Sequence, residues 1–434
     1  MSKKNVGFGA RGWMLTLYTF LSFLVWVAVT NYPNNIMASA YEGMFGWNAA
    51  LVATCYSAGS VISVIIQLFI NKKIANGNVK KLMIFFSIAT LVLGILLAVI
   101  TAQPIFLLIY VLVRIFGDIW TLLGNGVIVG QWFPTRKGTV MGITTFAFPI
   151  GTGVMLTLFT NLFYSRGALA GFAPYLIIGI VAVLILIFAL SNYPEEVGCF
   201  RDNDQSMSKE KAEEIMKSEM KARETSVWTV KNTLTSRDFW FLVIPEGGIL
   251  FAAVGFMVQI VSLLSSIDPE FYATKGGMVM TMITVVACIG SWLLGVLDTK
   301  FGTKTSILIA CIAMLVACIL GMVGTLSTVI ASAAFLAIFM GASSNYTVSG
   351  AASYWRREDF PSVFAIGSPV ANLIAAPGPA LIAIVAAAAG VSISFGMVAV
   401  ISVVSIVCIL LFNPKHLKEK DAKLRAQAGL PPAE

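Results

Sequence analysis

Residues 82–101 read LMIFFSIATLVLGILLAVIT, twenty consecutive residues without one charged side chain. An α-helix rises about 1.5 Å per residue, so a helix of this length spans the roughly 30 Å hydrocarbon core of a bilayer. Backbone N–H and C=O groups find no water at that depth, and a helix pairs them within a single segment. This stretch therefore predicts a transmembrane helix.

The same pattern recurs along the whole chain of 434 residues, of which 58% are hydrophobic and only 12% are charged. Soluble domains average about 25% charged residues, so lipid must be the solvent of this chain. We expect an all-α membrane protein of twelve transmembrane helices. The apolar runs lie at 12–32, 47–70, 82–101, 104–130, 139–163, 170–192, 239–265, 273–297, 305–325, 327–352, 361–386 and 391–412.

Positive charge indicates how the helices are oriented, because Lys and Arg concentrate in cytoplasmic loops. With the N-terminus inside, 26 of the 29 Lys and Arg fall in the tails and inner loops, and only Arg166 and Lys275 fall outside. A wrong number of spans would scramble this division. The count predicts a multi-pass protein of the cell inner membrane with cytoplasmic N- and C-termini. It also accounts for the net charge of +8 without a nucleic-acid partner.

A long polar stretch after the sixth span divides the chain into parts. We expect an N-terminal six-helix bundle at 1–192, a cytoplasmic linker at 193–238, a C-terminal six-helix bundle at 239–412 and a cytoplasmic tail at 413–434. The linker contains SMSKEKAEEIMKSEMKAR at 206–223, which is rich in helix formers of both charges. Two roles remain open for it, a plain connecting helix and a regulatory or partner-docking segment.

The two halves resemble each other when they are overlaid with an offset of 223 residues. Trp132 then aligns with Trp355, and Val140 aligns with Val363. The identities are few, but they indicate a duplicated six-helix unit. Parallel repeats of this kind are one standard plan of secondary transporters.

Short loop motifs resemble those of the major facilitator superfamily. The loop Asp298-Thr-Lys300-Phe-Gly302 is similar to the cytoplasmic signature of that superfamily, an acidic residue and a basic residue followed by a glycine turn. The segments FGWN at 45–48 and WFPTRKG at 132–138 resemble the oxalate/formate antiporter and monocarboxylate transporter branch. The resemblance implies the major facilitator fold and secondary active transport.

The sequence departs from that branch at its anion-binding positions. The oxalate transporter holds its anion with an Arg and a Lys, and this chain has Ser291 and Pro369 near those positions. The resemblance therefore does not supply the binding residues. A dicarboxylate such as oxalate is not expected as substrate, because the predicted spans contain a single cation, Arg114.

Three ionisable residues lie inside the predicted spans, namely Arg114, Asp118 and Glu246. A charge at a helix centre costs at least about 2.5–3.5 kcal/mol, so each needs a partner or a water-filled cavity. Arg114 and Asp118 are four residues apart and share one helix face. They form either a self-contained ion pair or a site in which Arg114 binds a substrate carboxylate in bidentate fashion and Asp118 takes part in proton coupling.

Glu246 lies in the sequence Pro245-Glu246-Gly247-Gly248, where the proline removes a backbone hydrogen bond and the glycines loosen the helix. Burial favours the protonated form of a carboxyl group, which suits a proton carrier. The alternative is a structural role, in which a protonated Glu246 bonds to the backbone of a neighbouring helix.

Two further sets of residues are candidates for the transport cycle. Polar and aromatic side chains within the spans are predicted to line a substrate cavity, although each could instead serve helix packing: Tyr18, Asn125, Gln259, Asn345 and Tyr346. Conformational gating is predicted for the loop motifs and for prolines that interrupt the fifth and eleventh spans: Asp298, Lys300, Gly302, Arg136, Lys137, Pro149, Pro369 and Pro377.

The sequence thus favours secondary active transport of a small organic monoanion or a zwitterion, by proton symport or exchange. Two alternatives stay open, an efflux carrier for amphipathic or aromatic compounds and a non-transporting membrane receptor or scaffold. We expect no enzymatic activity, cofactor or metal site, because the one histidine, His416, lies in the C-tail and there is no Walker loop. The expected partners are a small-molecule substrate and the bilayer, and we expect a monomer.

Overall fold

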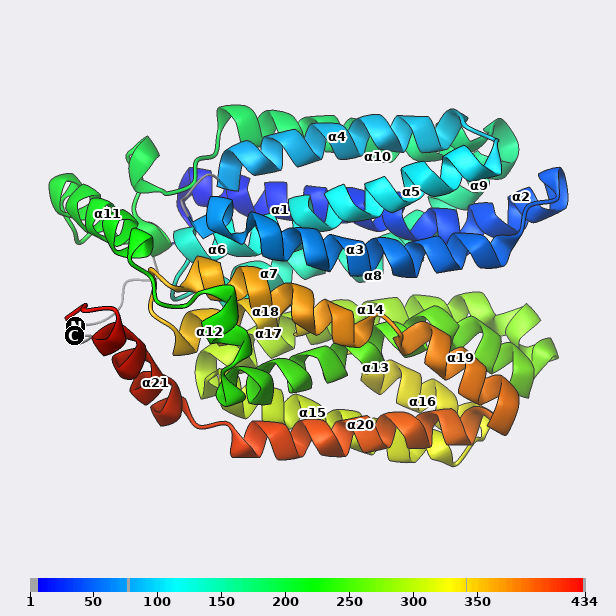
Figure 1. The fold of residues 1–434 in the computed structure, drawn as a ribbon. Coiled ribbons are helices and arrows are strands. Elements are labelled where there is room, and N and C mark those ends of the chain that lie inside the picture. The colour runs from blue at the N-terminus through cyan, green and yellow to red at the C-terminus, as the bar shows by residue number, and fades with distance from the viewer. Residues whose placement is uncertain (1–6, 76–78, 341, 432–434) are drawn as a thin grey trace. The chain divides into compact units, whose positions relative to one another are not determined.

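The computed structural model describes residues 7–75, 79–340 and 342–431, and every regular element in that part of the chain is a helix. The chain forms two compact units, unit 1 at residues 1–224 and unit 2 at 225–434. Figure 1 draws unit 1 from blue to green and unit 2 from green to red. The predicted all-α class is confirmed.

Unit 1 contains the first six spans in chain order. Short π-helical turns follow the first span (η1) and interrupt the fourth (η2) and the fifth (η3). Two 3-10 turns, η4 and η5, follow the sixth span. The elements are α1 (Gly9–Tyr32), η1 (Pro33–Met37), α2 (Ala38–Phe45), α3 (Ala49–Ala75), α4 (Val79–Val99), α5 (Gln103–Asp118), η2 (Ile119–Gly124), α6 (Asn125–Trp132), α7 (Lys137–Thr145), α8 (Ala147–Ile150), η3 (Gly151–Met155), α9 (Leu156–Arg166), α10 (Ala168–Phe188), η4 (Glu195–Val197), η5 (Arg201–Asn203) and α11 (Lys209–Glu224).

Unit 2 contains the last six spans, of which the tenth and eleventh are each made of two helices. The elements are α12 (Val230–Leu234), α13 (Arg237–Ile267), α14 (Pro269–Phe301), α15 (Thr303–Met322), α16 (Leu326–Ala337), α17 (Ala342–Tyr354), α18 (Phe360–Ala375), α19 (Gly378–Ala389), α20 (Val391–Leu411) and α21 (Pro414–Gln427).

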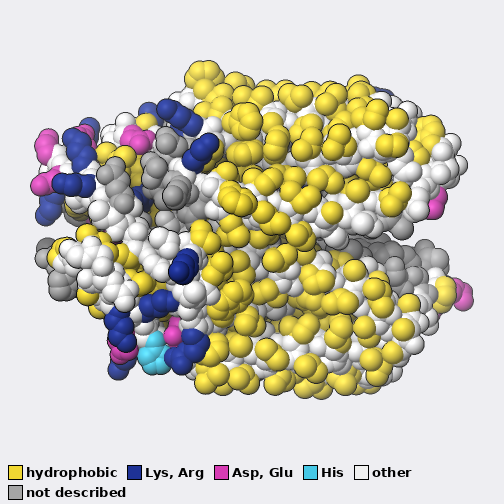
Figure 2. Space-filling model, in the orientation of Figure 1, with side chains coloured by type: hydrophobic (Ala, Val, Ile, Leu, Met, Phe, Trp, Pro, Cys, Tyr) yellow, Lys and Arg dark blue, Asp and Glu magenta, His cyan; other side chains and the backbone are white. Residues whose placement is uncertain are grey.

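Ten helical segments of the described chain are long and apolar enough to cross a membrane. Two shorter apolar segments, Thr54–Ile70 and Leu326–Ala337, lie at the second and tenth predicted spans. The twelve-helix prediction is therefore confirmed. Large apolar side chains such as Phe69 and Phe188 are 82% and 80% exposed. On the face drawn in Figure 2, apolar side chains cover most of both units, as a surface in contact with lipid requires.

The internal repeat is visible in equivalent contacts of the two units. Lys80, at the start of α4, donates from Nζ to the Ile187 carbonyl oxygen (3.0 Å) at the end of the sixth span. Lys304, at the start of α15, donates from Nζ to the Phe412 carbonyl oxygen (2.6 Å) after the twelfth span. In both units a cation thus binds carbonyl oxygens at a helix C-terminus, where the partial charge is negative.

Two glycines show the same repeat in the backbone. Gly167 precedes α10 with φ of 86°, and Gly390 precedes α20 with φ of 94°. These positions differ by 223 residues, the offset found in the sequence. Because a positive φ is strained for a residue with a Cβ atom, glycine is favoured at both positions. The matching φ values show that a similar turn connects the last two spans in each unit.

The predicted linker at 193–238 is shared between the units, with residues 193–224 in unit 1 and 225–238 in unit 2. Within unit 1, Arg201 connects the beginning and the end of the linker segment 193–224. The Arg201 guanidinium lies 2.5 Å from Glu195 Oε1 and 2.7 Å from Glu219 Oε1. The second bond fastens α11 to the segment after the sixth span. The cytoplasmic position of this stretch stays a prediction, as do the predicted domain boundaries.

Candidate functional site

The charged pair of unit 1 lies on α5 and is buried, with Arg114 7% and Asp118 4% exposed. Arg114 Nε lies 3.4 Å from Asp118 Oδ2, as the i,i+4 spacing predicts. Arg114 Nε also donates to Ser60 Oγ on α3 (3.0 Å), and Trp26 Nε1 on α1 donates to Asp118 Oδ1 (2.9 Å). Side chains from three helices therefore hold the pair in one arrangement.

Aromatic rings enclose the Arg114 guanidinium. Its Cζ lies 4.4 Å from the ring centroid of Tyr56 and 5.2 Å from that of Trp26. Such contacts stabilise a cation in a place of low polarity. Arg114 Nη1 is buried and makes no hydrogen bond within the described part of the chain. Because a buried donor without an acceptor is costly, Nη1 is a position where a ligand oxygen would be stabilised.

Glycines permit the close approach of the helices around the pair. A Cβ atom at Gly59 on α3 would lie 3.0 Å from the Arg114 Cβ, and one at Gly117 on α5 would lie 3.1 Å from Trp26 Cδ1. Larger residues at either position would push the neighbouring side chain away. The small residues thus set where Arg114 and Trp26 can sit.

The predicted lining residue Tyr18 lies on α1, and the predicted lining residue Asn125, on α6, contacts the same face of α1. Trp120 Nε1 donates to the Tyr18 hydroxyl (2.9 Å), and Asn125 Nδ2 donates to Ser22 Oγ (2.8 Å). The π-helical turn η2 lies between Asp118 and Asn125 in the fourth span. Such turns occur often at functional sites because they re-aim the side chains around them. The structure therefore brings Tyr18 and Asn125 together with the charged pair through α1.

The contacts of Trp26 and Ser60 were not predicted from the sequence. A signal for Trp26 exists, since Tyr18, Ser22, Trp26 and Thr30 follow one another at four-residue intervals and so form one row on α1. On α3, Tyr56 and Ser60 show the same spacing. Polar rows of this kind in a transmembrane helix indicate the face that meets another polar helix.

In unit 2, Glu246 on α13 is 2% exposed, and Asp298 on α14 is 7% exposed. Within the described residues no ion pair involves either carboxyl, and Glu246 Oε1 and Asp298 Oδ1 are buried without a hydrogen-bond partner. A Cβ atom at Gly350 on α17 would lie 2.5 Å from Glu246 Oε1, so this glycine makes the room that the carboxyl occupies. Glu246 thus lies against α17 without a cation.

The remaining lining candidates divide into two groups. Asn345 and Tyr346 are buried on α17, and the Tyr346 hydroxyl lies 2.8 Å from Ser306 Oγ. Gln259 lies thirteen residues beyond Glu246 on α13, or about 20 Å along the helix. The structure therefore brings Asn345 and Tyr346 onto the helix that contacts Glu246, and it does not bring Gln259 there.

All but one of the gating candidates lie near helix ends and breaks. Gly302 ends α14 with φ of 81°, Asp298 is buried one turn earlier, and Lys300 is exposed. Arg136 directly precedes α7 and Lys137 begins it, and Asp202 accepts a hydrogen bond from the Arg136 backbone N–H (3.2 Å). Pro149 on α8 lies at the break of the fifth span, and Pro377 lies at the break between α18 and α19 in the eleventh. Pro369 lies within the continuous helix α18, so the prediction that it interrupts the eleventh span is wrong.

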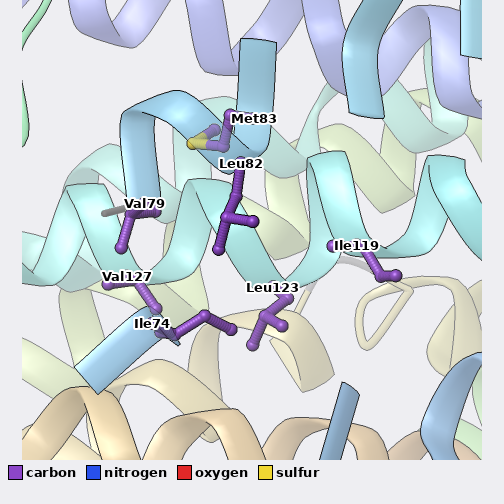
Figure 3. A pocket seen from close by; sticks show the side chains of 8 residues that line it. Ile74, Val79, Leu82, Met83, Ile119, Leu123 and Val127 are labelled. Carbon is purple, nitrogen blue, oxygen red and sulfur yellow. The ribbon is translucent and has the colours of Figure 1, made fainter. Parts of the chain in front are cut away.

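A pocket in unit 1 lies apart from these residues. Figure 3 shows its side chains converging from α4, η2, α6 and the end of α3. All are apolar, so they offer no group that recognises charge: Ile74, Val79, Leu82, Met83, Ile119, Leu123, Gly124 and Val127 line it. Arg114 and Asp118 do not contribute to this pocket, and it cannot account for anion binding.

Comparison with known proteins gives a family and a fold. The sequence matches the Major Facilitator Superfamily over residues 14–274 and 247–433. No curated protein matches it. The structure is similar to the proton:xylose symporter XylE bound to 6-bromo-6-deoxy-D-glucose, with a TM-score of 0.74, 12% identity, and 92% of this chain and 96% of that chain covered.

Two other solved structures have a comparable likeness. The human organic anion transporter MFSD10 (TETRAN) has a TM-score of 0.66 at 14% identity, covering 91% of this chain and 98% of that one. The transporter FucP in its outward conformation has a TM-score of 0.67 at 13% identity, covering 92% and 98%. At these identities the likeness establishes the twelve-helix fold but does not identify the substrate, which has to be inferred from the residues of this chain.

Proposed function

The chain belongs to the major facilitator superfamily and is a secondary transporter, and we propose that it moves a small organic monoanion or a zwitterion by proton symport or exchange. The observation that supports this substrate class is the buried Arg114 guanidinium, which retains one buried Nη1 donor without a partner among the described residues. A carboxylate is the acceptor that best matches this donor in charge and geometry.

The neighbouring carboxylate limits the charge of the substrate. Because Asp118 already compensates Arg114, the pair has no net charge before a ligand binds. A monoanion adds one negative charge, whereas a dianion would add a second that no nearby cation balances, at a large desolvation cost. A zwitterion satisfies both partners, with its carboxylate at Arg114 and its ammonium group at Asp118.

Proton coupling is the second part of the proposal. Glu246 and Asp118 are the carboxyl groups assigned to it, because both are buried in spans and can bind a proton there. The fold is compatible with both parts, since solved structures of this fold include a proton:xylose symporter and a human organic anion transporter.

The setting of the transporter completes the proposal. We place it as a monomer in the cell inner membrane with both termini in the cytoplasm, and the Lys and Arg distribution supports this orientation. Asp298, Lys300, Gly302, Arg136 and Lys137 are assigned to gating at the ends of spans. Pro149, Pro369 and Pro377 are assigned to bending of the fifth and eleventh spans.

Counterflow with small carboxylates in proteoliposomes tests the substrate class. The unmodified protein should exchange a labelled monocarboxylate or amino acid, and Arg114→Lys should lower that rate by more than about a hundredfold, because Lys keeps the charge but loses the planar fork. Arg166→Lys, an exposed residue at the end of α9, is the matched control. Unchanged exchange in Arg114→Lys would contradict carboxylate binding at this residue.

A second candidate is export of aromatic or amphipathic compounds. It is favoured by the aromatic group beside the charged pair, in which Trp26 lies 5.0 Å from Phe23 and 6.3 Å from Phe148 between ring centroids. Competition of the counterflow signal by uncharged aromatic compounds would identify this activity. Family membership favours either form of transport over the receptor or scaffold alternative.

A further inference from the structure

We propose that Arg223, Tyr193 and Arg201 form a binding site for a phosphate group, where α11 packs on the segment that follows the sixth span. The site lies in unit 1, outside the spans and apart from the charged pair on α5, so it does not depend on the transport function proposed above. A phosphate group bound there fastens α11 to the first six-helix bundle.

Printed contacts on both sides of the junction bring these side chains together. Arg201 Nη1 lies 2.7 Å from Glu219 Oε1 on α11, and Arg201 Nε lies 2.5 Å from Glu195 Oε1 in η4. One turn later on α11, the Arg223 Cζ lies 5.1 Å from the ring centroid of Tyr193, two residues before Glu195. Residues four apart are neighbours on a helix face, so both guanidinium groups lie where α11 packs on η4.

Several polar atoms at this junction are buried and have no hydrogen-bond partner among the described residues. They are Nε and Nη1 of Arg223, Nη2 of Arg201 and the hydroxyl oxygen of Tyr193. Arg223 is 6% exposed, and Tyr193 is 1% exposed. A buried donor without an acceptor is costly, most of all on a cation, so the site is incomplete without an acceptor.

The two arginines differ in their counter-charge. Arg201 binds both carboxylates, whereas Arg223 forms no ion pair in the described part of the chain. Burial works against the charge of Arg201, but Glu219 and Glu195 outweigh it and raise its pKa. At Arg223, burial prevails over the nearby Tyr193 and Glu219 and lowers the pKa. A buried cation whose neighbour takes the carboxylates favours a ligand of negative charge.

Two further cations are fixed at the end of the sixth span, a few residues before Tyr193. Arg11 Nη1 donates to the Ala189 carbonyl oxygen (3.3 Å), and Lys80 Nζ donates to the Ile187 carbonyl oxygen (3.0 Å). Their positive charge offsets the negative charge that a ligand adds beside Glu195 and Glu219. The surroundings therefore favour an anion as well.

The number of donors favours phosphate among the anions. The unpaired atoms belong to three separate side chains. A carboxylate has two oxygens in one plane, whereas a phosphate group presents three or more acceptor oxygens in a tetrahedron. Two sources supply this chemistry, a phospholipid headgroup and a soluble phosphate. A headgroup is within reach because Tyr193 directly follows the predicted sixth span.

Thermal unfolding of the full chain in detergent tests the site. Inorganic phosphate, compared with chloride at equal ionic strength, is the soluble probe, and phosphatidylglycerol, compared with phosphatidylcholine, is the lipid probe. A probe that binds the site should raise the unfolding midpoint of the unmodified protein in a saturable way. Arg223→Gln should weaken that binding by more than about tenfold, and Tyr193→Phe by about threefold. Lys211→Gln, exposed on the same helix, loses the same charge and is the matched control.

A second readout separates ligand binding from a structural role. Without either probe, Arg223→Gln should unfold at or above the midpoint of the unmodified protein, because it removes a buried charge without a counter-charge. With a probe that binds, the order should reverse. A midpoint that Arg223→Gln lowers equally with and without the probes would make Arg223 structural and overturn the proposal.

The remaining outcomes either identify the source or reject the site. A rise with phosphate alone identifies a soluble ligand, a rise with phosphatidylglycerol alone identifies a lipid headgroup, and a rise with both identifies a site open to either. No rise with either probe, or an equal loss of binding in Lys211→Gln, would overturn the proposal. Should Arg223→Gln not fold, Arg223→Lys decides: it keeps the charge but loses the planar fork, so it should weaken binding by about fivefold, and unchanged binding would reject the site.

Discussion

In unit 1 the buried Asp118 has Arg114 one turn away and the indole N–H of Trp26 as a donor, whereas in unit 2 the buried Glu246 has neither a cation nor a donor among the described residues. The two units share other features, as Lys80 and Lys304 show at similar helix ends. Their buried ionisable groups are where they differ.

The difference indicates a division of roles. A compensated pair can stay charged inside the membrane and recognise a charged ligand, because each partner lowers the cost of the other. A carboxyl without a cation is far more stable when protonated, so it suits reversible proton binding. We infer that unit 1 recognises the substrate and that, of the two carboxyl groups assigned to proton coupling, Glu246 in unit 2 is the main proton carrier. Four predictions test this comparison.

The largest expected effect is the all-or-none labelling of single cysteines, which tests whether both units have the same orientation. Reporters at Arg166 in unit 1 and Lys275 in unit 2 should react with a membrane-impermeant thiol reagent in intact cells, and reporters at Lys211 and Lys418 should not. Cys199 is replaced by Ser in the background protein, because it lies outside the spans and is only partly buried. Reversed labelling in one unit would show that the predicted orientation of that unit is wrong, and the two units could then not be compared as repeats.

The next effect concerns the stability of the unit 1 pair. Arg114→Ala and Asp118→Ala should each lower the free energy of unfolding by about 3–5 kcal/mol, because each leaves one buried charge without its partner. The double variant should recover much of that loss and should still fail in transport of an anion. Thermal unfolding in detergent and counterflow measure the two quantities. A double variant that transports at the normal rate would show that the pair is only structural.

A smaller effect is expected at Asp359, the residue before α18, which aligns with Arg136 before α7 in unit 1. Asp359 is buried and accepts a hydrogen bond from the Ser226 hydroxyl. Burial raises the pKa of Asp359 from 3.8 to about 6, an effect that its hydrogen bond to Ser226 opposes and the nearby Glu358 and Asp421 increase. The folded state therefore binds this proton more tightly than the unfolded state does.

The sign of the pH effect follows from that raised pKa. The stabilisation is fully present below about pH 4 and is lost as the pH rises through about 6, to a total of at most about 3 kcal/mol. Unfolding measured between pH 4 and 7 should show this slope, and Asp359→Asn should remove it while it keeps a polar residue before the helix. A slope that persists in Asp359→Asn would assign the titration to another group.

The smallest effect is expected at Glu246, and it sharpens the contrast with Asp118. Glu246→Gln should change the free energy of unfolding at pH 7 by less than about 1 kcal/mol, because Gln replaces a protonated carboxyl with a side chain of similar size and polarity. Asp118→Asn should cost more, since it leaves Arg114 without its counter-charge. Equal losses in the two variants would mean that Glu246 is charged and has a partner.

Much of the fold was predictable from local pattern. The breaks in the fifth and eleventh spans were visible as Pro149 and Pro377, whereas Pro369 lies within the continuous helix α18. The i,i+4 spacing identified the Arg114–Asp118 pair. The candidate Gln259 was chosen by residue type alone, and the structure separates it from Glu246 along α13. Residue type indicates a polar position in a span without indicating which helix it faces.

The sequence by itself determined the twelve spans, because each apolar run is long enough to cross the bilayer and pairs its backbone groups internally. It also determined the pair on α5, because neighbours one turn apart are set by helix geometry. Only the tertiary structure decided that Trp26 and Ser60 bind this pair and that Glu246 lies against α17. Lipid-facing and buried sides of these helices are both apolar, so hydrophobic periodicity does not encode how each helix is rotated against its neighbours.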